Sequence, residues 1–388
     1  MKTRSIISAA TAAAFLLGAV SADAQQAPKT IPAAPAQKLP TAEQVFKNVQ
    51  VLKGIPVDEF MGTMGFFAAS LSLNCTDCHV KAANDDWARY ADDTPLKQTA
   101  RKMVLMVRML NQNSFGGTQT ITCYTCHRSN NQPKDIPSLT EQYAVPPEDP
   151  NDVESHPQSL TPNAPTPAQI LDKYIAALGG AEKLAKLTSY VGKGSYTGFD
   201  TSADKVPVEV YAKAPDQRTT ILHAPVGGGV IKDGTTAFDG HSGWINAANT
   251  LVPMMNLTGG NLEGAKVDAV LSFPGSVKTM LTNLRAGFPA TRIGDRDVVV
   301  IEGNMGRSGV KLYFDKQSGL LLRQLRYART AVGLNPTQVD YSDYRDVAGV
   351  KLPFKWIVTW TDGQSSYEMD SIQANVPIDA SKFAMPKG

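Results

Sequence analysis

The chain has 388 residues, of which 42% are hydrophobic and 19% are charged, as in an ordinary globular protein with room for two or three domains. Its formal net charge is +2, from 38 basic and 36 acidic residues. This balance gives no reason to expect nucleic acid or an acidic surface as the partner of the whole chain.

The first predicted element is an export signal over residues 1–24. Lys2 and Arg4 precede an apolar run from about residue 6 to 20, and the small residues at 22–24 form a cleavage site. The run is short for a bilayer span, and no later stretch reaches about eighteen uninterrupted apolar residues. No cysteine lies near the cleavage site to carry a lipid anchor. We therefore expect a periplasmic protein without a transmembrane helix.

All four cysteines lie in two segments of the same form, CTDCH at 75–79 and CYTCH at 123–127. In an exported chain this spacing is that of covalent haem c attachment. Two thioethers hold the haem, and the adjoining histidine, His79 or His127, is the proximal iron ligand. Structural disulfides, a redox dithiol and a zinc site are the alternatives; a disulfide needs no histidine, and an immediately adjacent histidine suits tetrahedral zinc poorly. We expect two haem c groups, attached at Cys75, Cys78, Cys123 and Cys126.

A helix with methionines on its apolar face is predicted before each cysteine pair. The first face has i, i+4, i+7, i+11 spacing and contains Phe60, Met64, Phe67 and Leu71. The second contains Met103, Met106, Val107 and Leu110. Such methionines usually fill a core, but beside a haem one methionine per helix is expected to bind iron. The other histidines, 156, 223 and 241, lie in later parts of the chain.

These segments carry a resemblance to a known family. The runs "NVQVLKGIPVDEFMGTMGFF", "CTDCH", "TARKMVLMVRMLN" and "TCYTCHR" are similar to the cytochrome c subunit of photosynthetic reaction centres, over roughly residues 43–133. The resemblance implies that the axial iron ligands are Met64 and Met103, and that the protein passes electrons to other redox proteins. The best-known members carry four haems and are often lipid-anchored, whereas this chain has two attachment motifs. A role in photosynthesis is therefore left open.

A linker is predicted over residues 136–166, because nine prolines lie between 133 and 167 and proline disfavours both helix and central strand. A helix then follows with Ile170, Tyr174 and Leu178 on one face, and Gly179 ends it. Alternating apolar and polar residues next predict antiparallel strands over 205–224, 296–304, 310–329, 337–347 and 351–363. A more helical stretch near 263–284 interrupts them. The phrases "DKQSGLLLR" and "YSDYRDVAGVKLPFKW" resemble periplasmic lipoprotein carriers of the LolA type.

The expected fold class is a two-domain chain. A mainly α-helical dihaem cytochrome c domain, 25–135, is followed after the linker by an α+β domain, 167–388. The second domain is expected to form a curved antiparallel half-barrel around a helix.

The expected function is one-electron transfer through two His/Met-ligated haems, without enzymatic activity. The expected partners are other cytochromes, a membrane electron-transfer complex and, through the resemblance, a photosynthetic reaction centre. Two alternatives remain: a haem enzyme similar to dihaem peroxidases, which needs an open iron position, and a carrier that binds a lipid or another hydrophobic ligand in the second domain.

Overall fold

The computed structural model describes residues 39–84, 86–139, 149–151, 163–225, 230–247, 252–289 and 291–386. The predicted export signal, 1–24, and most of the predicted linker, 136–166, lie outside the described residues. Residues 39–388 form one compact unit.

Among the described residues, four helices are longer than ten residues and the others are short. Before the linker lie α1 (Ala42–Val45), α2 (Val57–Leu71), α3 (Cys75–Cys78), α4 (Pro95–Ser114) and α5 (Cys123–His127). After it lie α7 (Pro167–Ala177), α8 (Ala181–Lys186), α9 (Gly259–Leu271) and α10 (Val277–Met280). Thr94 and Thr166 begin α4 and α7 by accepting a hydrogen bond from a backbone N–H of the first turn, and a proline follows each threonine.

In the described part of the chain, all strands lie after residue 188. Their bounds are β1 (Ser189–Gly198), β2 (Lys205–Lys213), β3 (Gln217–Pro225), β4 (Ile231–Phe238), β5 (Gly243–Asn246), β6 (Met254–Leu257), β7 (Thr282–Arg285), β8 (Thr291–Ile293), β9 (Arg296–Met305), β10 (Ser308–Asp315), β11 (Leu321–Arg329), β12 (Leu334–Val347), β13 (Val350–Trp360) and β14 (Gly363–Ala374). They make one 14-stranded sheet in the order β6-β5-β4-β3-β2-β1-β14-β13-β12-β11-β10-β9-β7, and β8 pairs with β9. Neighbouring strands are antiparallel throughout, including β1 and β14, where Tyr190 lies opposite Ala374.

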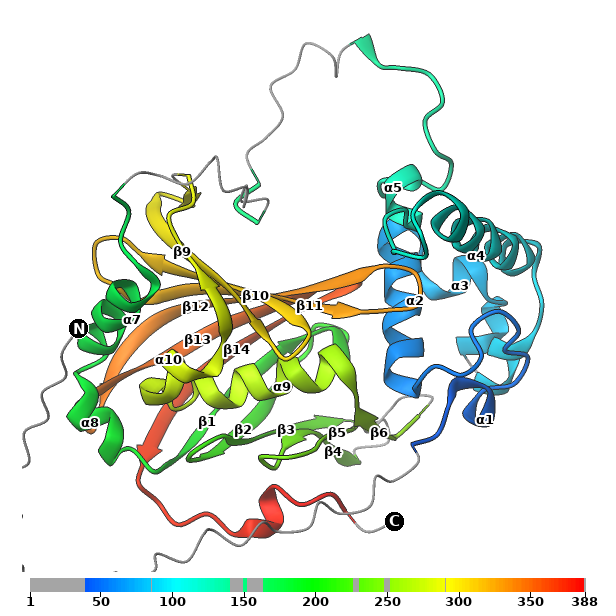
Figure 1. Ribbon diagram of the computed structural model, residues 1–388. Helices are drawn as coiled ribbons and strands as arrows, with labels where there is room; N and C mark the ends of the chain where they lie inside the picture. The colour runs from blue at the N-terminus through cyan, green and yellow to red at the C-terminus, as the bar shows by residue number, and fades with distance from the viewer. Residues whose placement is uncertain are drawn as a thin grey trace, which may run out of the picture. The chain divides into compact units, whose positions relative to one another are not determined.

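The sheet curves around α9, with α7, α8 and α10 nearby (Figure 1). The main core lies on this side of the sheet, where Leu171 of α7, Leu178 just after α7 and Val267 of α9 join inward-facing strand residues such as Val208 and Leu312. Alternate residues of a strand point to opposite faces, so the apolar half of each alternating run reaches this core. Burial of these side chains, rather than the hydrogen-bonded ladder alone, fixes the register.

The expected fold class is wrong. The region before residue 135 is only partly helical: in its described part, α2 and α4 are the helices longer than five residues, and loops and single turns make up much of the rest. Most of the described chain after residue 188 belongs to one large 14-stranded antiparallel sheet.

The physical reason for this error is that helical periodicity describes single elements and not their packing. The apolar cluster of the region before residue 135 has few buried members, and one of them, Val332, comes from the β11–β12 turn of the sheet. The other buried members are Leu52, Phe66, Val104 and Cys123.

Candidate haem attachment sites

The first cysteine pair lies on one capped helical turn. The side chain of Asn74 accepts hydrogen bonds from the backbone N–H groups of Thr76 (3.1 Å) and Asp77 (3.2 Å). The Asp77 carboxylate accepts in return from the Asn74 N–H at 2.8 Å. This reciprocal cap holds Cys75 and Cys78 on α3, with both thiols free. Two thiols on a single turn are what attachment to one haem requires.

His79 follows this turn and is oriented by a backbone carbonyl. Its Nδ1 lies 3.0 Å from the carbonyl oxygen of Tyr90, and its ring lies 4.8 Å from the Tyr90 ring between centroids. Burial, with a smaller effect of the Lys97 ammonium, lowers the pKa of His79, while the carbonyl hydrogen bond opposes this. A neutral imidazole that donates from Nδ1 keeps the lone pair of Nε2 for a metal.

The second cysteine pair repeats this arrangement. The hydroxyl of Thr122 accepts from the Thr125 N–H at 3.3 Å, and the Thr125 hydroxyl accepts from the Thr122 N–H at 3.0 Å. The turn between them is α5, which carries Cys123 and Cys126. Nδ1 of His127 lies 3.0 Å from the Asn130 carbonyl oxygen, so this ring too can keep Nε2 for a metal.

The two thiols of the second pair differ in exposure. Cys126 is exposed, whereas Cys123 is 8% exposed and packs in the cluster with Phe66, Val104 and Val332. Burial raises the pKa of the Cys123 thiol to about 11. Cys123 is therefore a weaker nucleophile in this folded conformation than an exposed thiol.

Asn111 ties α4 to the loop that leads into α5. It is 7% exposed, and its amide donates to the Ile121 carbonyl at 2.8 Å. Its Oδ1 accepts from the N–H groups of Thr120 (3.0 Å) and Ile121 (2.9 Å). Nothing in the local sequence marks this asparagine, because its role depends on the loop folding back onto the helix. The Asn74–Asp77 cap, by contrast, could have been found from its spacing.

The two predicted methionine ligands lie on different helices. Met64 is partly buried on α2, beside Phe60 and Phe67, and packs against the small apolar cluster. Met103 on α4 is 38% exposed. The structure places Met64 and Met103 on the two helices that precede the cysteine pairs.

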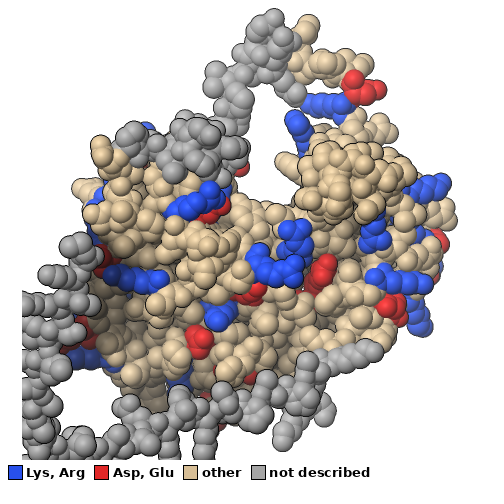
Figure 2. Space-filling view, in the orientation of Figure 1, with Lys and Arg blue, Asp and Glu red and all other residues tan. Residues whose placement is uncertain are grey.

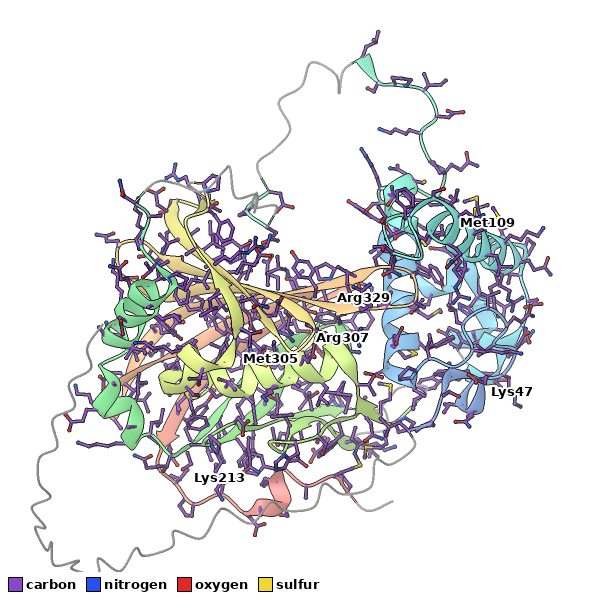
Figure 3. The ribbon with its side chains drawn as sticks, in the orientation of Figure 1. Lys47, Met109, Lys213, Met305, Arg307 and Arg329 are labelled. Atoms are coloured by element: carbon purple, nitrogen blue, oxygen red, sulfur yellow. The ribbon has the colours of Figure 1, made fainter. Side chains whose placement is uncertain are left out.

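The described side chains before residue 135 leave an unusual amount of apolar surface open. Figure 2 shows few charged side chains over the region of α4, and Figure 3 shows Met109 on this helix. The exposed large apolar side chains of α4 and its surroundings are Leu96, Met103, Leu105, Met106, Met109, Leu110, Phe115 and Tyr124. A surface of this kind on a small region marks a binding site for an apolar group or a partner. A porphyrin attached to the neighbouring cysteines fits it.

Two arginines of α4 that could have faced haem propionates have protein partners instead. Arg101 forms an ion pair with Asp93 at 2.8 Å, and Arg108 donates to the carbonyl of Val51 at 2.6 Å. Arg101 thereby fastens the loop before α4 to this helix, and Arg108 fastens the loop before α2 to it.

Other kinds of site find little support in the geometry. All four thiols are free in the structure. Across the described ranges, no group of three or more His, Cys, Asp or Glu side chains is arranged to hold a metal ion. No helix among the described residues is long and apolar enough to cross a membrane.

Comparison with known structures adds a likeness for the sheet. A LolA superfamily protein from Nitrosomonas europaea matches with a TM-score of 0.38 and 14% identity, over 57% of this chain and 99% of that protein. A putative outer membrane lipoprotein-sorting protein domain from Vibrio parahaemolyticus matches with a TM-score of 0.38 and 11% identity, over 55% of this chain and 97% of that protein. The carboxy-terminal half thus resembles LolA-like folds, at a level that carries no argument about function.

Comparison of sequences concerns the cysteine-bearing part. Residues 10–190 match the family model described as the photosynthetic reaction centre cytochrome C subunit. The reaction centre cytochrome c subunit of Thermochromatium tepidum is 38% identical over 120 residues, 30% of this chain and 28% of that protein. That of Rubrivivax gelatinosus is 35% identical over 116 residues, 29% of this chain and 30% of that protein. The match therefore spans less than a third of these relatives' length. The part of this chain that carries both cysteine pairs is similar to the cytochrome c subunit of photosynthetic reaction centres, as its motifs predict.

Proposed function

We propose that this protein is a periplasmic c-type cytochrome that transfers single electrons through two covalently attached haems. The observation that carries the proposal is the repeated unit of a capped turn, two free cysteines and a histidine whose Nδ1 faces a backbone carbonyl. The sequence similarity to reaction centre cytochrome subunits supports the same function.

In this proposal residues 25–135 bind the haems, 136–166 are a linker and 167–388 form the sheet domain. Cys75 and Cys78 hold the first haem and Cys123 and Cys126 the second. When bound, each haem iron supplies a one-electron couple. The chain's own residues fix its ligation: His79 and His127 offer Nε2, and Met64 and Met103 offer thioether sulfur.

Histidine and methionine together would hold each iron and raise its potential. This ligand set would leave no position for a substrate, which favours electron transfer over catalysis. The redox partners we expect are other cytochromes and a membrane electron-transfer complex. A photosynthetic reaction centre is the partner that the named relatives indicate.

The test is to produce the protein in a host with c-type cytochrome maturation machinery and to measure haem by the pyridine haemochrome assay. We expect two covalent haems per chain. Replacing either cysteine pair by alanine should leave one haem, because each pair is expected to hold its own. Absence of covalent haem in the unmodified protein would overturn the proposal.

The axial ligands are tested by matched methionine variants. Met64→Leu and Met103→Leu should each weaken the methionine-to-iron charge-transfer band and lower the potential of one haem. Met61→Leu and Met106→Leu, which change neighbouring exposed methionines of the same two helices, should do neither. Immediate carbon monoxide binding to the reduced unmodified protein would indicate an open iron and favour a haem enzyme.

A further inference from the structure

Helix α2 has two faces with different partners. Met64, Phe60 and Leu71 lie along one side of the helix, on the apolar stripe that we assign to the first haem. Asp58, Gly62, Gly65 and Phe66 have i, i+4, i+7, i+8 spacing and lie on another side. This second side contacts the part of the chain that forms the sheet and α9, through Asp58, Gly62, Gly65 and Phe66. One side of α2 therefore belongs to the first candidate haem site, and another side contacts the sheet.

The first contact is a buried carboxylate. Asp58 is 6% exposed, and its Oδ2 accepts from the Thr258 N–H at 2.7 Å and from the Asn261 side-chain amide at 3.0 Å. Its Oδ1 accepts from the Thr258 hydroxyl at 2.7 Å. Thr258 is the residue before α9, and its hydroxyl makes no cap for its own helix. A carboxylate at the positive, N-terminal end of a helix, with hydrogen-bond donors at both of its oxygens, makes a favourable and strongly directional contact.

The second and third contacts come from the ends of two hairpins. Asn335 at the start of β12 donates from its side-chain amide to the Gly62 carbonyl at 2.7 Å. A Cβ placed on Gly65 would lie 2.9 Å from the Asp362 carboxylate and 3.0 Å from the Thr361 hydroxyl. The glycine thus allows the β13–β14 turn to lie against the helix. Figure 1 shows the β11–β12 hairpin end reaching α2, and Figure 3 labels Arg329 at this end of the sheet.

We propose that Asp58 is a positioning residue: it fixes α2, and with it Met64, to the amino end of α9, so that the sheet sets the ligand geometry of the first haem. This inference rests on the proposed function. It gives the sheet domain a part in electron transfer, because the strength of methionine binding determines the potential of the iron. Helix α9 lies in the curve of the sheet, where its Asp268 binds Arg326 of β11 at 3.1 Å. A change in the sheet that moved α9 would thus also move α2.

The decisive variants change the contact between Asp58 and Thr258 from each of its two residues. Asp58→Asn keeps the shape but removes the charge and replaces one acceptor oxygen with an N–H₂ donor, so the charge-assisted hydrogen bonds are lost and the donors at that oxygen must turn away or reverse. Thr258→Val removes one donor from the sheet side, 200 residues away in sequence. Glu263→Gln is the matched control. This α9 carboxylate accepts from the Arg307 N–H at 3.0 Å, in the turn between β9 and β10.

Each variant is measured in two backgrounds that hold one haem, made by replacing either the second or the first cysteine pair with alanine. The readouts are the methionine-to-iron charge-transfer band and the midpoint potential. With the first haem alone, we expect Asp58→Asn to weaken the band and lower the potential, and Thr258→Val to do so to a smaller extent. With the second haem alone, neither variant should change them. Glu263→Gln should be silent in both backgrounds.

An unchanged first-haem spectrum and potential in Asp58→Asn would overturn the inference while leaving the proposed function intact. Equal changes at both haems would also overturn it, because they would indicate general loosening of the fold. If the unmodified protein carries no covalent haem, the proposed function fails first and this inference falls with it.

Discussion

At the residue scale, the four cysteines share a motif but not an environment. Cys75 and Cys126 are exposed, whereas Cys123 is buried in a cluster that includes Val332, a residue about 200 positions further along the chain. Haem attachment needs access to both thiols of a pair. The order of folding and attachment therefore matters more at the second pair than at the first.

This difference predicts the alkylation rates of the haem-free, reduced protein. At pH 8 the pKa of about 11 leaves little Cys123 thiolate, and the thiolate is the attacking species. Allowing for the greater nucleophilicity of a high-pKa thiolate, we expect Cys123 to react roughly 20-fold more slowly than an exposed thiol of ordinary pKa. The Cys123 rate should keep rising as the pH approaches its pKa. Iodoacetamide labelling followed by peptide mass spectrometry measures this, with exposed Cys126 as the internal comparison; equal rates would contradict it.

At the scale of single elements, the β11–β12 turn completes the core of the proposed haem-binding part, residues 39–135, called the haem region below. Val332 is 3% exposed within the cluster, and Gly333 lies so close to Phe66 that a Cβ on the glycine would be 2.2 Å from the ring. The turn is also held by Gln119, whose side-chain amide donates to the Thr330 carbonyl at 3.2 Å. Gly333 is needed here for close approach.

A double-mutant cycle tests this contact. Phe66→Ala should lower the free energy of unfolding by about 3–5 kcal/mol, because it opens a cavity in a small core. Gly333→Ala should lower it by about 1–3 kcal/mol, because the new methyl group overpacks the ring. The double variant should be less destabilised than the sum by about 1 kcal/mol, since the methyl group then enters the space that the ring has left.

The control for this cycle is Gly275→Ala, whose Cβ would have its nearest neighbour at an ordinary 3.8 Å. It should change stability little. Denaturant unfolding of the unmodified protein, the two single variants and the double variant measures the two single losses of stability and the coupling between them. Strict additivity of Phe66→Ala and Gly333→Ala would show that the ring and the turn do not touch in solution.

At the scale of the whole molecule, the haem region and the sheet share the small apolar core with Val332. They are also connected by the hydrogen bonds of buried Asp58 to Thr258. A region with so few buried residues of its own has little apolar burial to stabilise it. We therefore expect one cooperative unfolding transition instead of two. The proposed linker separates the two parts along the sequence. The contacts of α2 couple the unfolding of one part to that of the other.

Coincidence of two probes tests this expectation. The Soret band reports on the haem region and far-ultraviolet circular dichroism on the sheet, and their denaturant midpoints should agree. Val332→Ala should lower both midpoints together, at a cost of about 1–3 kcal/mol, although the residue belongs to the sheet domain by sequence. A haem transition that moves alone, or precedes the loss of the sheet, would show that the two parts unfold independently.

The sequence by itself determined the chemistry of single segments. Cysteine spacing and the adjoining histidine predict haem attachment, and period-two alternation marked strands such as β9 and β13 because side-chain direction is a local property of the backbone. Local patterns do not show which distant residues an element will contact. They therefore could not predict the order of the 14 strands, the burial of Cys123 in a cluster with Val332, or the hydrogen bonds between Asp58 and Thr258. Those features depend on contacts between residues far apart in the chain. Only the tertiary structure decided that the methionine helix α2 is held by the sheet.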